Sequence, residues 1–416
     1  MVSSSQNATR RLLGFGFWIQ GFRAFPWMAI NFFLKDTLNV DPSTLQLLQN
    51  SANLPMVAKP LYGVVSDAIY FSGQHRLPYI AIGGISKRFS FPSNLGASIA
   101  EVANDAIVAE TGKQPASSSS SKSSQGSGEL QSFVWMASAA GGVLGNLLGG
   151  IAIDKFSPQS MFHIFGLLVA LQFVITIGSH ESSLNLPKSQ SKIGIRKQLS
   201  VLLAALQKPE IAYSIAWFAA SYAIIPALTG TMFFYQTQYL NINSSVLGIS
   251  KVFGQFTMLL WGVIYNHYLK SIPPRKVIVA VQVSMALLMV SDVLFVKGIY
   301  REIGVGDTLY VVILSGVLEV LFFFKILPFS VVMAKLCPQG CEGSLMALVM
   351  SAIALAMIVS GYLGIALASY VGVSGNDFSG FPCGLMIQAV CTLLPVLCSS
   401  FMHDDAAKPK TMGKVE

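Results

Sequence analysis

The feature that most constrains this chain is a succession of apolar segments, each of roughly 20 residues or more, separated by short polar stretches. A helix needs about 20 apolar residues to cross the hydrocarbon core of a bilayer, so these segments are candidate transmembrane helices. Only 11% of the residues are charged, whereas a soluble domain has about a quarter. The chain is therefore predicted to be an all-α integral membrane protein with the lipid bilayer as partner. Full spans are expected at 12–34, 43–65, 130–153, 160–180, 210–236, 245–269, 277–297, 308–334, 342–371 and 381–401.

The formal net charge of +8 does not indicate a nucleic-acid partner. The basic residues gather in short loops between apolar segments, which is typical of membrane topology and not of a phosphate-binding face. The sequence contains no Walker loop and no paired histidines, and the cysteines Cys337 and Cys341 have no histidine nearby. Neither an enzyme nor a metal or cofactor site is expected.

Two polar stretches divide the chain. Residues 111–129 are rich in serine and have no large apolar side chain to pack, and residues 181–209 are basic. We expect an N-terminal bundle, a cytosolic linker, a six-helix C-terminal bundle and a polar tail, at residues 1–180, 181–209, 210–403 and 404–416.

The two predicted bundles repeat one loop pattern. After the second span the sequence reads "GVVSD" and then "GQHRLPY", and after the sixth it reads "GVIYNHYLKSIPPRKV". Matching loops at matching places indicate two halves related by a pseudo-two-fold axis along the membrane normal. The first loop, with Asp67 at one helix end and Arg76 before the next helix, resembles the loop between helices two and three of the major facilitator superfamily. The resemblance implies that Asp67 and Arg76 latch the two bundles; an ordinary positive-inside loop is the alternative. Lys59 precedes Pro60 near the cytosolic end of its helix, where it either extends to the interface or joins the gate, and contact with the substrate is the less favoured alternative.

Five segments in order resemble the folate–biopterin transporter family, a branch of that superfamily. They are "LPMVAKPLYGVVSD" (54–67), "RLPY" (76–79), "SNLGASIAEVANDAIVAE" (93–110), "GGVLGNLLGGIAID" (141–154) and "KILPFSVVMAKLCPQGCEGSLMALVMS" (325–351). The resemblance implies a secondary active transporter of twelve helices that moves folate, biopterin or a related pteridine by alternating access.

One segment departs from the family pattern. Between "RLPY" and "SNLGAS" lies only "IAIGGISKRFSFP", where members of the family carry a whole third helix. We therefore expect about 11 helices instead of 12, with the third truncated around 77–92. A helix at about 95–110, joined to a short irregular piece buried in the bundle, is the expected replacement.

Charge counting predicts the orientation. If both termini are cytosolic, lysines and arginines on the cytosolic side outnumber those opposite by roughly three to one. Keeping that orientation requires region 77–110 to cross an even number of times, although it is too short for two crossings of about 20 residues each.

Ionisable residues inside spans are costly in lipid and are candidates for function. They are Arg23, Lys59, Glu101, Asp105, Lys251, Asp292, Glu319 and Lys325. The proposed cargo would place Glu101 and Asp105, one turn apart, at the pterin edge or at a coupling proton, and Arg23 and Lys325 at the carboxylates of the folate tail. Alternatively, Glu319 and Lys325 form a structural ion pair. Asp292 has no obvious partner in the sequence.

Two other functions stay open at this point. Loss of the third helix would suit a transport-inactive or regulatory isoform, and the intramembrane cations would also suit a carrier of another organic anion.

Overall fold

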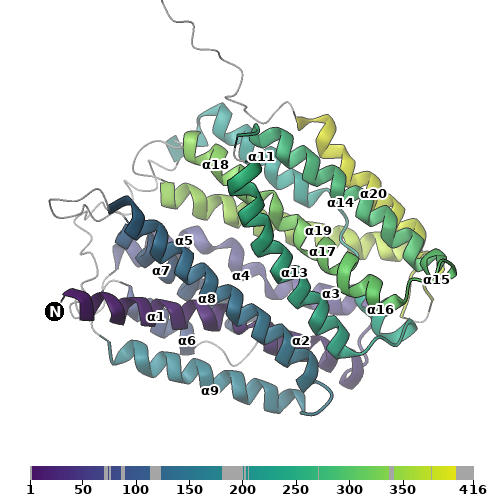
Figure 1. Cartoon of the computed structure of the whole chain (residues 1–416), viewed down its shortest axis with the longest axis horizontal. Helices are drawn as coiled ribbons and strands as arrows, with labels where there is room; N and C mark the ends of the chain where they lie inside the picture. Colours follow the sequence, from purple (N-terminus) through teal and green to yellow (C-terminus); the bar gives the residue numbers. More distant parts are fainter. Residues whose placement is uncertain are drawn as a thin grey trace, which may run out of the picture.

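The computed structural model describes the chain in segments that are almost entirely helical (Figure 1). The described residues are 2–69, 74, 76–85, 90–112, 123–179, 200, 203–204, 206–269, 271–336, 342–375 and 377–399.

The N-terminal half contributes nine helices to this description. They are α1 (Val2–Phe22), α2 (Ala24–Phe32), α3 (Pro42–Ala52), α4 (Leu54–Val57), α5 (Lys59–Ala68), α6 (Leu77–Ile85), α7 (Ser90–Gly112), α8 (Ser123–Ala152) and α9 (Pro158–Ile177). The described α-helices of the C-terminal half are α11 (Pro209–Ala223), α12 (Thr229–Phe234), α13 (Ser244–Ile264), α14 (Pro274–Val296), α15 (Ile299–Glu302), α16 (Asp307–Tyr310), α17 (Gly316–Phe324), α18 (Ile326–Leu336), α19 (Glu342–Tyr370) and α20 (Phe381–Leu397). Short π-helical turns extend several of them: η1 (Phe33–Thr37), η2 (Tyr235–Tyr239), η3 (Tyr265–Leu269) and η4 (Val311–Ser315).

Among the described residues, six continuous helical stretches are long and apolar enough to cross a bilayer. They are Phe133–Ala152, Pro158–Ile177, Ser244–Leu269, Pro274–Val296, Asp307–Met333 and Ala347–Tyr370. Other predicted spans are present as helices in consecutive pieces, such as α1–α2, α3–α5 and α11–α12. The chain is an integral multi-pass membrane protein.

Prolines account for most of the breaks within spans. Arg23 and Lys325 each stand three residues before a proline, and Asn53 and Ala58 two residues before one. A proline has no N–H to donate to the carbonyl four residues earlier, and its ring crowds that carbonyl. The carbonyl left over by Pro328 belongs to Phe324, and it accepts a hydrogen bond from the Trp261 indole at 3.2 Å. Two of the intramembrane cations, Arg23 and Lys325, therefore sit at loosened turns.

The predicted truncation of the third helix corresponds to α6, which has nine residues. Such a helix rises about 13 Å, less than half of a hydrocarbon core of about 30 Å. Its first turn is anchored beside the end of α5, because the Tyr79 hydroxyl donates to the carbonyls of Val65 and Ile69 at 3.1 and 3.0 Å.

The next helix, α7, returns the chain to the end from which α6 started. Near its beginning, Asn94 donates to the carbonyl of Ala52 at 2.7 Å, and near its end, Ile107 shares an apolar cluster with Leu77 at the start of α6. The pair α6–α7 therefore enters and leaves the N-terminal bundle at one side. α7 is longer than the helix expected at 95–110, and it runs alongside α3–α5.

Helices α1–α9 pack mainly against one another, as do α11–α20, and the two groups meet along α8–α13 and along α3–α5 with α19. The glycines of "GGVLGNLLGG" allow this close packing, because residues without a side chain let two helix backbones approach each other. A Cβ on Gly150 would lie 3.0 Å from the Ser244 carbonyl, and one on Gly248 2.8 Å from the Asn146 carbonyl. Ser244 also donates to the carbonyl of Gly150 at 2.9 Å.

A second junction between the two groups forms around Gln46, a buried residue of α3. Its Nε2 donates to the carbonyls of Ala227 and Gly361, each at 2.7 Å, and its Oε1 accepts from the Gly230 amide at 2.8 Å. Ala227 lies in the non-helical break between α11 and α12, and Gly361 lies in α19. One side chain of the N-terminal bundle thus satisfies backbone groups of two helices of the other bundle. We call this end of the molecule, which also carries Asp41, the Asp41 end.

Candidate functional site

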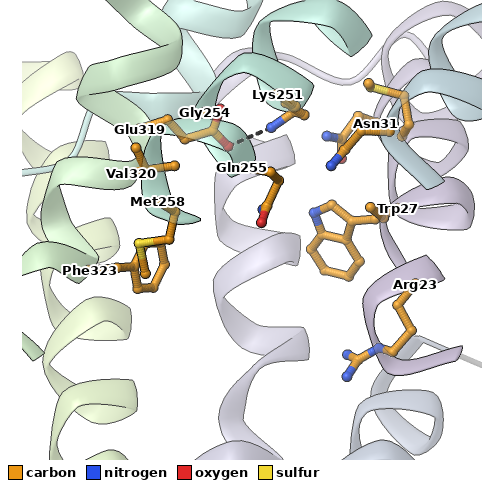
Figure 2. Close-up of a pocket in the computed structure, with 13 residues that line it drawn as sticks. Arg23, Trp27, Asn31, Lys251, Gly254, Gln255, Met258, Glu319, Val320 and Phe323 are labelled. Atoms are coloured by element: carbon orange, nitrogen blue, oxygen red, sulfur yellow. Dashed lines mark hydrogen bonds and ion pairs between the residues drawn. The ribbon is translucent and has the colours of Figure 1, made fainter. Parts of the chain in front are cut away.

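A cavity of about 450 Å³ lies between the two bundles (Figure 2). One wall comes from the N-terminal bundle and the other from α13 and α17 of the C-terminal bundle. The lining residues are Arg23, Ala24, Trp27, Met28, Asn31, Asn146, Lys251, Gly254, Gln255, Met258, Glu319, Val320 and Phe323. This volume is within the range of pockets that enclose small organic ligands, about 300–1,000 Å³.

Helical spacing explains how each wall presents its side chains. Arg23, Trp27 and Asn31 are four residues apart, so they share one face of the first span. On the opposite wall, Lys251 and Gln255 follow the same spacing along α13.

An ion network lies at the Arg23 end of the cavity. Arg23 Nη1 and Lys59 Nζ both contact the Glu101 carboxylate, each at 2.7 Å and on different oxygens. Arg23 Nη2 also donates to Asn94 Oδ1 at 2.9 Å, and Asn94 is held in turn by the carbonyl of Ala52. The network joins the first span to α5 and α7, and Arg23 is its member that lines the cavity.

A second ion pair lies across the cavity in the C-terminal bundle. Lys251 Nζ contacts Glu319 Oε1 at 2.6 Å, and Figure 2 shows both side chains on the wall opposite Trp27. The partner of Glu319 is therefore Lys251, and the alternative pairing of Glu319 with Lys325 was wrong. Residues six positions apart on a helix point in directions about 120° apart, so the two side chains leave their span on different faces.

Lys325 lies in the core of the C-terminal bundle and is not among the residues that line the cavity. Its Nζ donates to Gln282 Oε1 at 2.9 Å and to the hydroxyl and carbonyl oxygens of Ser221 at 3.2 Å. The amine also lies 3.8 Å from the centre of the Tyr222 ring. Neutral oxygens and an aromatic face thus surround a buried amine.

The other predicted site residues lie around the ends of α5 and α7. Asp105, one turn beyond Glu101, has an exposed side chain and makes no hydrogen bond or ion pair with the rest of the described chain. Arg76 is buried, and its Nη1 donates to Ser66 Oγ at 2.7 Å. Asp67 belongs to the last turn of α5, but its side chain lies outside the described part of the structure.

Asp292, which had no partner in the sequence, is buried in α14 and accepts a hydrogen bond from the Tyr310 hydroxyl at 2.9 Å. The same hydroxyl lies 2.9 Å from Ser291 Oγ. This cluster is away from the cavity lining.

Sequence reasoning missed the uncharged polar and aromatic residues of the cavity: Trp27, Asn31, Asn146 and Gln255. A signal for three of them was available, because Trp27 and Asn31 follow Arg23 at helical spacing and Gln255 follows Lys251. Only charged residues were selected as candidates, since the cost of burying a charge in lipid is the largest.

The sequence profile of the BT1 family matches residues 20–92 and 86–412. A protein of Arabidopsis thaliana named "Probable folate-biopterin transporter 7" is 59% identical, over 99% of this chain and 97% of its own length. That alignment spans 433 positions, more than the 416 residues of this chain, so the relative has residues with no counterpart here.

Solved structures match the fold at low sequence identity. The nucleoside transporter NupG has a TM-score of 0.63 at 15% identity, covering 96% of this chain and 98% of its own. A D-xylose-proton symporter has a TM-score of 0.62 at 14% identity, covering 100% of this chain and 99% of its own. The two-bundle fold of such transporters is therefore the fold of this chain, as the sequence predicted.

Proposed function

The chain belongs to the BT1 family, and from this premise we propose that it is a secondary active transporter of folate, biopterin or a related pteridine. Transport by alternating access needs a binding site between two bundles that can open at either end. The cavity between the first span and helices α13 and α17 occupies that position.

The observation that carries this proposal is the network around Arg23. Two cations, Arg23 and Lys59, contact the single carboxylate of Glu101, so neither cation has that carboxylate to itself. A guanidinium has five N–H donors, and the structure records two hydrogen bonds from Arg23, to Glu101 and Asn94. Arg23 can therefore bind a carboxylate of a folate tail while keeping its internal partner.

Glu101, Asp105 and Lys325 have separate proposed roles. Glu101 orients the Arg23 guanidinium, and some of the guanidinium N–H donors turn to the cargo when an anionic cargo binds. The exposed carboxyl of Asp105, one turn away, is a candidate carrier of a coupling proton, and so is the Lys325 amine, which adjoins no carboxylate in the described chain. A bundle-core amine of this kind suits proton or conformational coupling better than direct contact with the cargo.

Uptake into vesicles tests the proposal. We expect purified protein in proteoliposomes to accumulate labelled folate and biopterin, with competition by pteridines and not by unrelated carboxylates. Arg23→Gln should raise the KM for folate about tenfold or more, because a charge-assisted hydrogen bond contributes roughly 1.5–3 kcal/mol. Biopterin, which has no glutamate tail, should change little.

Arg301→Gln is the matched control. Arg301 of α15 pairs with Asp307 of α16 at 2.7 Å, outside the cavity lining, and its loss should leave both substrates unaffected. Absence of uptake for every pteridine would contradict the proposed cargo, and competition by unrelated carboxylates would favour a carrier of another organic anion.

A second candidate function is a transport-inactive or regulatory isoform. It is favoured by the short α6 and by the two family-profile matches, which meet at residues 86–92 directly after α6. A chain that folds and reaches its membrane but moves no pteridine would support this candidate over the first.

The proposed orientation places both termini and the linker at 181–209 in the cytosol, between bundles at 1–180 and 210–403. Charge counting and the return of α7 to the side where α6 begins support it. In this orientation Asp67, Arg76 and Lys59 lie toward the cytosolic side, where we propose that Asp67 and Arg76 latch the bundles.

A further inference from the structure

The middle of the cavity differs from its two charged ends. Between the Arg23 network and the Lys251–Glu319 pair, Trp27 and Gln255 face each other from opposite bundles (Figure 2). Both polar groups have no hydrogen-bond partner within the described part of the chain. Both side chains are only partly buried and line the cavity, so their polar groups are accessible to a ligand.

Trp27 differs from two other tryptophans of the same protein, whose indole N–H groups do have partners. The indole of Trp217 donates to the carbonyl of Pro395, and that of Trp261 to the carbonyl of Phe324, each at 3.2 Å. The ring of Trp261 also stacks on Phe324, with centroids 4.5 Å apart. The half-buried ring of Trp27 has neither kind of contact with the other described residues, so its face and its N–H are available to a ligand.

Gln255 is similarly available, while the other cavity amides are engaged. Asn31 Oδ1 accepts from Gln49 at 2.6 Å, and Asn146 Nδ2 donates to the carbonyl of Gly142 at 3.0 Å. Gly142 also adjoins Gln255: a Cβ built there would lie 3.8 Å from Gln255 Cδ. The small residue leaves room for the Gln255 amide beside α8.

The chemistry of this pair fits a flat heterocycle. An indole face stacks on a planar aromatic ring without regard to its substituents. A carboxamide offers one donor and one acceptor side by side, so it pairs with a ring edge that presents the complementary pattern. The pyrimidinone edge of a pterin has such a pattern, whereas a sugar or an aliphatic acid has no planar face to stack.

We propose that Trp27 and Gln255 form a ring subsite that stacks on the pterin and reads its edge, separate from the Arg23 subsite that binds a carboxylate tail. This inference rests on the proposed pteridine cargo. It assigns the two halves of a folate molecule to different residues, and it makes the ring subsite common to folate and biopterin.

The test uses three ligands that contain the ring alone, the tail alone or both: biopterin, p-aminobenzoyl-glutamate and folate. Their Kd values are measured by calorimetry on the full chain in detergent, for the wild type and for Trp27→Ala, Trp27→Phe, Gln255→Leu and Arg23→Gln. Trp27→Ala and Gln255→Leu should weaken folate and biopterin about tenfold each and leave p-aminobenzoyl-glutamate within twofold. Trp27→Phe should recover most of the loss, since a phenyl ring still stacks. Arg23→Gln should instead weaken folate and p-aminobenzoyl-glutamate, which carry the tail, and leave biopterin within twofold.

Trp135→Ala is the matched control, because Trp135 is an exposed tryptophan of α8 outside the cavity lining, and its loss should leave every Kd unchanged. Equal weakening of all three ligands by Trp27→Ala, or unchanged affinity for the two pterins, would overturn the ring subsite. If wild-type protein of normal thermal stability binds none of the three, the proposed cargo itself is wrong, and the ring subsite is wrong with it.

Discussion

Replacing Gln46 by leucine should release the contact between the bundles at the Asp41 end. Leucine occupies a similar volume, but it cannot replace the hydrogen bonds to Ala227, Gly361 and Gly230, which lie between 2.7 and 2.8 Å. Gly230 is in the first turn of α12, where backbone N–H groups have no partner within the helix. In the wild type, Gln46 therefore caps α12 from the other bundle.

The size of the effect follows from these three hydrogen bonds. Each contributes about 1 kcal/mol net, and a buried group left unpaired costs about 1–3 kcal/mol. Their joint loss should favour separation of the bundles by about 3 kcal/mol, which corresponds to roughly a hundredfold in the equilibrium.

Hydrogen exchange measured by mass spectrometry checks this prediction, because the Gly230 amide donates to Gln46 Oε1 across the junction. The neighbouring Ala227 amide donates to the carbonyl of Ser360 in α19. Peptides covering 224–231 should exchange about 100 times faster in Gln46→Leu, as the opening free energy falls. The control is Gln49→Leu on the same helix, whose hydrogen bond to Asn31 stays within one bundle. Exchange at 224–231 that matches the control would refute the reasoning.

Three further predictions concern other parts of the chain. Asp41→Ala should cost about 1 kcal/mol of stability by removing the N-cap of α3. Partial burial raises the pKa of Asp41. Hydrogen bonds from the Thr44 side chain and from the Thr44 and Ser43 amides lower the pKa by more than burial raises it, so the net pKa lies below 3.8. The stability difference in denaturant melts should therefore be complete at neutral pH and disappear as the pH falls below 3.8. Asp67→Asn should slow substrate exchange in vesicles while the Kd for folate stays within a few-fold, and a large loss of affinity at an unchanged rate would contradict a gating role. Inserting an apolar span of about 20 residues after Ile85 should raise the melting temperature in detergent and the rate of folate uptake, whereas no change in either would make the short α6 a complete working variant.

The sequence alone was sufficient for the membrane class, the two-bundle fold and the family. These properties follow from local patterns: the lengths of apolar segments, the positions of basic loops and the order of short motifs. The close approach of glycine-rich helices was also predictable, because residues without side chains have few other uses in a span. The truncation of the third helix was visible as a missing length of chain, and α6 has the short form that this length allows.

The pairing of charges was decided only by the tertiary structure. The sequence supplies eight ionisable residues in spans, but where one of them forms an ion pair in the described chain, its partner comes from another helix. Arg23 and Glu101, for example, are 78 positions apart. Glu319 and Lys325 were attractive as a pair because they are near in sequence. The side chains of Glu319 and Lys325 leave the helix in different directions. Glu319 therefore pairs with Lys251, and Lys325 forms its hydrogen bonds in the core of the C-terminal bundle.

Uncharged groups depend on the tertiary structure for a further reason. Gln46 and Gln255 are both glutamines within apolar spans, and nothing local in the sequence says which of them finds hydrogen-bond partners. Packing of the two bundles places Gln46 against three backbone groups and leaves the amide of Gln255 open to the cavity without a partner in the described chain. Packing of the helices thus decides that Gln46 connects the bundles and that Gln255 is available to a ligand. The reason is that a hydrogen bond requires a partner within about 3 Å, and only the folded chain brings such partners together.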